Sequence, residues 1–141
     1  MRFFPVVLIV FLSFFSCISD EIKTIDVSNI SADFEVNRYE VDFYDASTKT
    51  LPQVKSKYPY LFPKEFTDSL SLVKINDKDE QELFTETQKI YKDFSFVEYQ
   101  LKSLFKHVKY YNPEFNAPKV VTMLSNIDYE SRVIYADSLL L

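Results

Sequence analysis

The sequence predicts an α+β fold in which an N-terminal strand is followed by a helical hairpin and then by a β-hairpin. Strand-like apolar patterns occur near both ends of the expected domain, and apolar residues recur at a three-four spacing in its middle, which indicates helices. The 141 residues include 14 Phe and 10 Tyr. This is enough apolar surface for one domain with a modest core, so a disordered chain is not expected.

The first residues have the layout of a bacterial lipoprotein signal rather than of a folded element. Arg2 is followed by the apolar run 3–15, which is shorter than the roughly 20 residues that a helix needs to cross a bilayer. Ser16 and Cys17, the only cysteine, come next. A small residue before a single cysteine is typical of chains that are cleaved there and acylated on the cysteine sulfur. We therefore expect residues 1–16 to be a removed signal peptide and Cys17 to be the lipid-attachment site.

Two positions depart from the usual lipoprotein pattern, which has Leu three residues before the cysteine and a small residue two before it. Phe14 and Phe15 occupy these positions, so an ordinary secretory signal and an uncleaved anchor remain alternatives. Residues 17–32 are polar and lack periodicity, and are interpreted as a lipid-anchored tether. Ile18 stands where Asp would signal inner-membrane retention in some bacteria, so we expect an outer-membrane location in the cell envelope.

The domain is expected to occupy residues 33–141. An N-terminal strand is predicted over 34–43, with a break around 37–40, because Phe34, Val36, Val41 and Phe43 are spaced as strand positions. A short helix is predicted over 51–57, with a proline tolerated in its first turn. The segment 58–63 has prolines at both ends of three large apolar residues, and is interpreted as an ordered, extended plug packed on the domain.

Two helices are predicted over 77–91 and 94–110. They meet at Lys92-Asp93, which suits an antiparallel hairpin, and Asn112-Pro113 ends the second helix. The second helix has the clearer amphipathic pattern, formed by Phe94, Val97, Leu101, Leu104, Phe105 and Val108.

Two strands are predicted at the C-terminal end, over 120–124 and 133–141, with a turn over 126–131 that joins them into a β-hairpin. The chain stops within an apolar run of three leucines. Because domains seldom end in this way, we expect the domain to be incomplete at its C-terminus and to be the N-terminal part of a larger one.

Composition excludes several classes of function. The chain contains no glycine, whereas phosphate-binding loops, dinucleotide fingerprints and nucleophile elbows all require it, so nucleotide enzymes and α/β-hydrolases are not expected. The net charge is −5, which argues against nucleic acid as a partner. It also favours attachment to membranes through acyl chains over attachment through a polybasic surface.

Some side chains could carry chemistry, but a structural role is favoured for each. His107 is the only histidine, so a zinc site with two histidines four apart on a helix cannot form within this sequence. Asp77, Asp79 and Glu82 resemble the start of a calcium loop, yet the glycine of the tight turn is missing and Gln88 replaces the final Glu. Helix capping is the favoured role of these acids. We therefore predict no catalytic, cofactor-binding or metal-binding residue.

Three surface features have both a functional and a structural interpretation. The carboxylates of Glu82 and Glu86 lie four residues apart on the polar side of a helix, where a solvated face is favoured over an acid–base pair. A basic stripe could meet an acidic partner or a membrane surface, although a solvated face is again favoured; it comprises Lys102, Lys106 and Lys109. An aromatic recognition patch could equally be core packing; it comprises Tyr58, Tyr60, Phe62, Tyr110 and Tyr111.

Several ordered blocks of the sequence resemble the gliding-motility lipoprotein B (GldB) family of Bacteroidota. They are the segments 57–63, 104–111, 118–120 and 134–141, which follow the lipoprotein start in matching order. The resemblance implies a palmitate-bearing lipoprotein of the gliding machinery, which is coupled to type IX secretion. It also implies a distant similarity to zinc-peptidase-like domains, whose metal-binding helix would lie beyond residue 141. Cys17 is the one position to which a family role is transferred.

Three hypotheses follow. The favoured one is a non-enzymatic, lipid-anchored assembly component whose partners are the membrane and other envelope or gliding-machinery proteins. The first alternative is the N-terminal half of a zinc-peptidase-like envelope enzyme. The second is a binding module that captures a peptide or a glycan through the aromatic segment.

Overall fold

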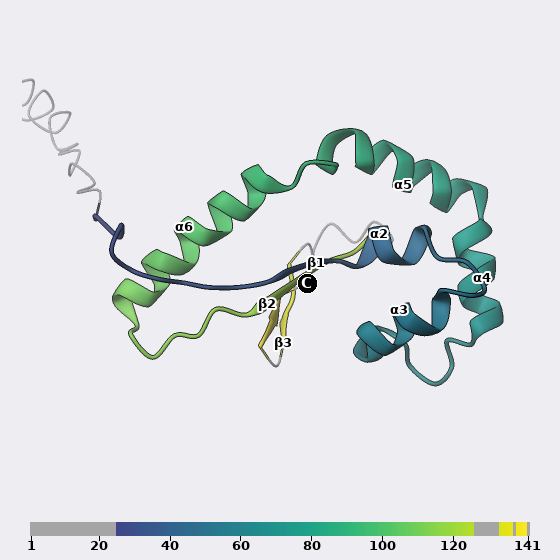
Figure 1. Cartoon of the computed structure of the whole chain (residues 1–141), viewed down its shortest axis with the longest axis horizontal. Helices are drawn as coiled ribbons and strands as arrows, with labels where there is room; N and C mark the ends of the chain where they lie inside the picture. Colours follow the sequence, from purple (N-terminus) through teal and green to yellow (C-terminus); the bar gives the residue numbers. More distant parts are fainter. Residues whose placement is uncertain (1–24, 126–132, 137, 141) are drawn as a thin grey trace, which may run out of the picture.

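The computed structural model describes residues 25–125, 133–136 and 138–140 (Figure 1). Helices dominate the chain between the first two strands, and the fold is α+β as predicted. None of the helices in this described part combines the length and the apolar character needed to span a bilayer. In chain order the elements are β1 (Val36–Arg38), α2 (Tyr39–Tyr44), α3 (Leu51–Lys57), the 3₁₀ turn η2 (Pro59–Leu61), α4 (Asp68–Asn76), α5 (Lys78–Tyr91), α6 (Ser95–Tyr111), β2 (Lys119–Thr122), β3 (Tyr135–Ala136) and β4 (Leu139–Leu140).

The strands form one mixed sheet in the order β1-β2-β4-β3. β1 and β2 are parallel, with Val36 opposite Val120, although more than eighty residues of chain separate these two positions. β2 is also parallel to β4, with Val120 opposite Leu140. β3 and β4 form the antiparallel pair at the edge of the sheet, with Tyr135 opposite Leu140. All the helices of the described residues therefore lie in the long connection between the parallel neighbours β1 and β2.

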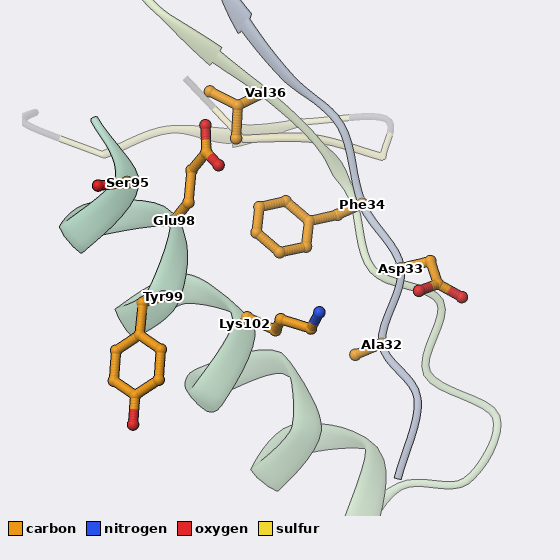
Figure 2. A pocket seen from close by; sticks show the side chains of 8 residues that line it. All are labelled: Ala32, Asp33, Phe34, Val36, Ser95, Glu98, Tyr99 and Lys102. Atoms are coloured by element: carbon orange, nitrogen blue, oxygen red, sulfur yellow. The ribbon is translucent and has the colours of Figure 1, made fainter. Parts of the chain in front are cut away.

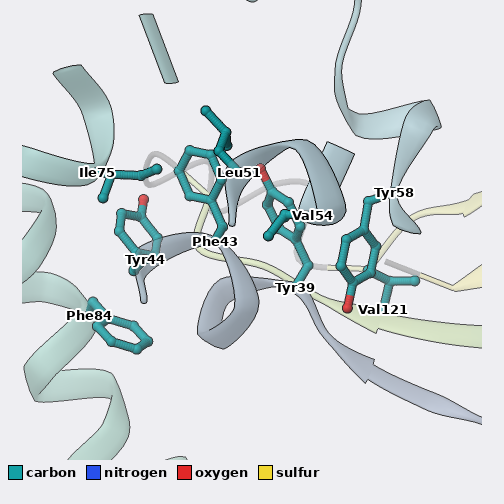
Figure 3. Packing of buried hydrophobic residues seen from close by; sticks show 9 residues of the cluster. All are labelled: Tyr39, Phe43, Tyr44, Leu51, Val54, Tyr58, Ile75, Phe84 and Val121. Carbon is teal, nitrogen blue, oxygen red and sulfur yellow. The ribbon is translucent and has the colours of Figure 1, made fainter. Parts of the chain in front are cut away.

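The larger hydrophobic cluster is built around the short helix α2. One face of this helix is buried against α3, α4, α5 and β2 (Figure 3). Aromatic rings supply most of the contacts: the Tyr39 and Phe43 rings stack with centroids 5.2 Å apart, and the Tyr44 and Phe84 rings stack at 5.3 Å. The buried members of this cluster are Tyr39, Phe43, Tyr44, Leu51, Val54, Tyr58, Ile75, Phe84 and Val121.

A second cluster joins α6 to the sheet. Phe105 lies between the ring of Phe34, at 5.0 Å in an edge-to-face arrangement, and the ring of Phe115, at 5.9 Å. Ala32 and Val120 complete the buried part of this cluster. Val120 belongs to this cluster and Val121 to the other, as expected because neighbouring strand residues face opposite sides of a sheet. The sheet therefore separates α6 on one face from α2 and α3 on the other.

All three predicted helices are confirmed. α3 has the predicted bounds, with Pro52 in its first turn. α5 begins at Lys78 behind its cap Asp77, and α6 runs from Ser95 to Tyr111 and ends at Asn112, as the Asn112-Pro113 pair indicated.

The predicted N-terminal strand is wrong over most of its length. Only Val36–Arg38 is a strand, which begins at a predicted strand position and runs into the expected break, and Tyr39–Tyr44 is helical. The apolar spacing of this segment fits either structure, and the helix is stabilised because it places Tyr39, Phe43 and Tyr44 together in the core. The segment 58–63 is a 3₁₀ turn over Pro59–Leu61 rather than extended, although Tyr58 is buried as the plug interpretation requires.

The predicted pairings of elements are wrong as well. α5 and α6 do not form an antiparallel hairpin, since they follow one another along an arc (Figure 1), and each packs on a different cluster. The first C-terminal strand does not form a hairpin with the second: β2 pairs in parallel with β4, and the antiparallel pair β3–β4 lies within the segment 133–141. The expected turn at 126–131 lies outside the described residues. The helix α4 was not predicted.

Candidate functional site

The predicted lipid-attachment site, Cys17, and the predicted signal peptide lie outside the described residues. The described chain begins at Ile25, and residues 27–36, termed here the lead segment, run along α6. The ammonium group of Lys106 on α6 donates a hydrogen bond to the carbonyl oxygen of Ser28 at 3.3 Å. Ala32 is buried in the second cluster. The division into tether and domain at residue 33 stays a prediction, but the chain that leads from Cys17 is already packed on α6 before that point.

A pocket of about 380 Å³ lies between the lead segment and α6 (Figure 2). The ring of Phe34 points from the lead segment toward the helix, and Lys102 extends from the helix toward Ala32. Glu98 reaches toward Val36. Charges of both signs therefore surround an aromatic ring along the line where the lead segment meets the helix.

A second cavity, an apolar groove of about 540 Å³, lies between the start of α6 and the sheet. Phe94 and Val97 line it from the helix, while Val120, Thr122 and Leu140 line it from the sheet. Three side chains in the lining carry a hydroxyl group: Tyr91, Thr122 and Ser125. The other lining side chains are hydrophobic.

A buried ion pair borders this groove. The Nε of Arg38 donates to Oε1 of Glu40 at 2.5 Å, and the hydroxyl of Thr122 donates to Oε2 of the same carboxylate. Glu40 is only 2% exposed, and the guanidinium carbon of Arg38 lies 4.8 Å from the centroid of the Phe94 ring. Both carboxylate oxygens are therefore occupied within the fold. Glu40 links α2 to the ends of β1 and β2 and is a structural group rather than a free acid or base.

This ion pair was not predicted from the sequence. An acidic residue between the aromatic positions Tyr39 and Phe43 is the one signal that could have indicated it, because a charge within an apolar stretch is buried only when it has a partner.

Two further carboxylates are hydrogen-bonded to tyrosines. The hydroxyl of Tyr58 donates to Oδ2 of Asp42 at 2.6 Å, and Lys57 donates to the same oxygen at 2.8 Å. Burial alone would raise the pKa of Asp42, but these two hydrogen bonds outweigh it, so the pKa of Asp42 falls below its ordinary value of 3.8. Burial, together with the hydrogen bond to Asp42, raises the pKa of Tyr58 to about 12.

The second carboxylate of this kind is Glu80 on α5, which accepts hydrogen bonds from the hydroxyl of Tyr44 and the ammonium group of Lys74. Burial would raise the pKa of Glu80, but the hydrogen bonds from Lys74 and Tyr44 outweigh it, and the pKa falls below 4.5. This cluster connects α2, α4 and α5, so its role is to hold three helices together.

The remaining candidates from the sequence have structural surroundings. His107 is half-buried, and its Nδ1 lies 2.7 Å from the carbonyl oxygen of Ser103, one turn earlier on α6. Asp77 caps α5 by accepting hydrogen bonds from two backbone N–H groups, at 3.0 and 3.1 Å. Glu86 is exposed and pairs with Lys89 at 2.5 Å. Across residues 25–125, 133–136 and 138–140, no group of three or more His, Cys, Asp or Glu side chains could hold a metal ion.

The aromatic patch proposed from the sequence is not formed. Tyr58 is buried in the larger cluster, whereas Tyr110 and Tyr111 are exposed at the C-terminal end of α6, on the opposite side of the molecule from α3 (Figure 1). The basic stripe does form one side of α6: Lys102 and Lys106 both line a cavity against the lead segment.

The whole described fold lies within one family match. The family model described as gliding motility protein GldB matches residues 20–141. This chain belongs to the GldB family. No protein with a curated description and no solved structure matches the chain. The GldB match begins three residues after Cys17 and includes both hydrophobic clusters and the buried Arg38–Glu40 pair, so a role in gliding motility is assigned to the chain that builds this fold.

Proposed function

We propose that this GldB-family protein is a lipid-anchored component of the gliding machinery in the cell envelope, linked to type IX secretion. It acts by assembling with other envelope proteins rather than as an enzyme. The family match over residues 20–141, directly behind a lipoprotein-like start that ends at Cys17, is the observation that carries the proposal.

The anchor has a direct physical consequence. Acyl chains on Cys17 would hold the domain against one membrane, and restriction to a surface raises its effective concentration for other proteins held there. A stable anchor needs two lipid signals, because one acyl chain gives only marginal and reversible binding. A cysteine acylated on both its sulfur and its amino group would meet this requirement.

The non-enzymatic role is supported by the state of the charged groups in the fold. The buried or half-buried carboxylates of Glu40, Asp42 and Glu80 each accept hydrogen bonds from side chains of the fold itself. Such hydrogen bonds stabilise contacts between elements of the fold.

Replacement of Cys17 by Ser in the host tests the anchor. We expect the variant to lose labelling by a fatty-acid analogue and to move from the membrane fraction to the soluble fraction. A gene deletion complemented with this variant should spread less over a surface than one complemented with the wild-type gene.

Ser19→Ala is the matched control, because it changes a small residue two positions after the cysteine and leaves the thiol in place. It should be labelled, membrane-bound and active in spreading. Continued membrane retention of the Cys17→Ser variant would contradict the lipid anchor, and normal spreading of the deletion strain would contradict a gliding role.

A further inference from the structure

One helix of the fold is apolar on two opposite sides. α6 packs through Leu101 and Phe105 on the lead segment and the sheet. Its opposite side carries large side chains that are between 48% and 72% exposed. At 3.6 residues per turn, these side chains fall within a sector of about 140° on the side of the helix away from Phe105, termed here the outward face. The outward face consists of Phe96, Tyr99, Leu104, Tyr110 and Tyr111.

Five large apolar or aromatic groups on one side of one helix are more than the single exposed side chains that protein surfaces commonly carry. The four rings are three tyrosines and one phenylalanine on α6. Tyrosine is the residue type that places an apolar ring and a polar tip at a membrane–water interface.

The charge of α6 is the reverse of that of the whole chain. The net charge of the chain is −5, whereas α6 contains three lysines and a single acidic residue, Glu98. Figure 2 shows Glu98 reaching toward Val36, and Tyr99 projecting from α6 at the edge of the pocket that the helix shares with the lead segment. Lys102 and Lys106 line a cavity against the lead segment together with Tyr99, so their positive charge lies along one edge of the outward face, where it complements anionic lipid headgroups.

The chain that carries the predicted anchor leaves from this same helix. Lys106 holds Ser28 of the lead segment, and seven residues separate Ile25 from Cys17. At about 3.5 Å per extended residue, this stretch reaches at most about 30 Å. An acylated Cys17 would therefore keep α6 within a short distance of the bilayer.

We propose that the outward face of α6 lies on the bilayer surface, with its rings at the level of the headgroups and its lysines paired with anionic lipids. This inference rests on the proposed lipid anchor. It adds a fixed orientation: the face of the sheet that carries α2 and α3 is turned away from the membrane and toward other envelope proteins.

The absence of tryptophan from the sequence allows a direct test with single-tryptophan reporters. Tyr99→Trp places the reporter on the outward face, at a position that is 72% exposed. Val73→Trp is the matched control, because Val73 is 68% exposed and belongs to α4, at the far end of the molecule (Figure 1). The full acylated chain is reconstituted into vesicles of phosphatidylethanolamine and phosphatidylglycerol, with and without bromine on the acyl chains.

Brominated lipid should quench the Tyr99→Trp variant at least about twofold more than the Val73→Trp variant, because interfacial side chains reach about 5–10 Å into the headgroup–acyl boundary. Adding Lys102→Glu should reduce the quenching at position 99, whereas Lys49→Glu, a charge reversal in an exposed turn, should leave it unchanged. Circular dichroism of each variant shows that the fold is retained.

Other results would overturn the proposal in distinguishable ways. If the protein floats with the vesicles but both reporters are quenched equally, the anchor stands and the docking is wrong. If the reporter at position 99 is shielded from water yet not quenched by bromine, a protein covers the face instead of lipid. If the acylated protein does not float with the vesicles at all, the anchor fails, and the docking fails with it.

Discussion

The buried pair of Arg38 and Glu40 makes a quantitative prediction about stability. Arg38→Met removes the cation but leaves Glu40, whose side chain is 3% exposed, as a buried charge. Breaking a buried pair in this way costs about 3–5 kcal/mol. Because Thr122 still donates to the carboxylate, we expect a loss near the lower end, about 3 kcal/mol in the free energy of unfolding.

The double variant Arg38→Met/Glu40→Leu removes both charges together. Replacing a buried pair by hydrophobic side chains of similar size is often neutral, so the double variant should regain most of this loss and lie within about 1 kcal/mol of the wild type. Lys89→Met is the matched control, because it breaks an exposed pair with Glu86 and should cost no more than about 0.5 kcal/mol.

Urea unfolding followed by circular dichroism measures all four proteins. The prediction concerns the difference in the free energy of unfolding between variants and does not depend on the absolute stability of any one of them. If Arg38→Met is no less stable than Lys89→Met, or if the double variant is as unstable as Arg38→Met alone, Glu40 is not the buried, paired charge described above.

Three further predictions concern pH and packing. Folding lowers the pKa values of Asp42 and Glu80, so the stability that these groups contribute is complete above their ordinary pKa values of 3.8 and 4.5 and is lost as the pH falls below them. Urea unfolding across this pH range should show the loss of stability, and Asp42→Asn should make that loss smaller. Since folding raises the pKa of Tyr58 to about 12, its contribution is complete below 10.0 and is lost as the pH rises through about 12; titration of phenolate absorbance should show a late step that Tyr58→Phe diminishes. Phe105→Ala should lower the free energy of unfolding by about 3–5 kcal/mol, whereas Phe96→Ala, at an exposed position, should change it by no more than about 0.5 kcal/mol; equal losses would contradict the assignment of the two faces of α6.

Local signals in the sequence were sufficient to predict α3, α5 and α6. The ends of these helices are marked by Pro52, Asp77 and Asn112, and each mark acts on the backbone of the nearest turn. The segment 39–44 could not be assigned in the same way, because its few apolar positions fit a strand and a helix equally well. The cap of α4 was present in the sequence, since Thr67 accepts a hydrogen bond from the N–H of Leu70, but the helix has no strong apolar stripe.

Pairing between elements depends on contacts that the sequence does not order. Two helices joined by two residues suggest a hairpin, yet Phe84 of α5 stacks on Tyr44 and Phe105 of α6 packs on Phe34, so each helix has its own partner. The parallel pair β1–β2 joins positions that are distant in sequence, whereas pattern analysis favours strands that are neighbours in the chain. The Arg38–Glu40–Thr122 contact depends on that same pairing and could not be found without it.

Mass spectrometry of the mature protein from its host tests the central claim most directly. The account predicts an N-terminal peptide that begins at Cys17 and carries a mass increase from acyl chains on that residue. A peptide in which Cys17 is unmodified, or one that still includes residues 1–16, would contradict the lipid anchor.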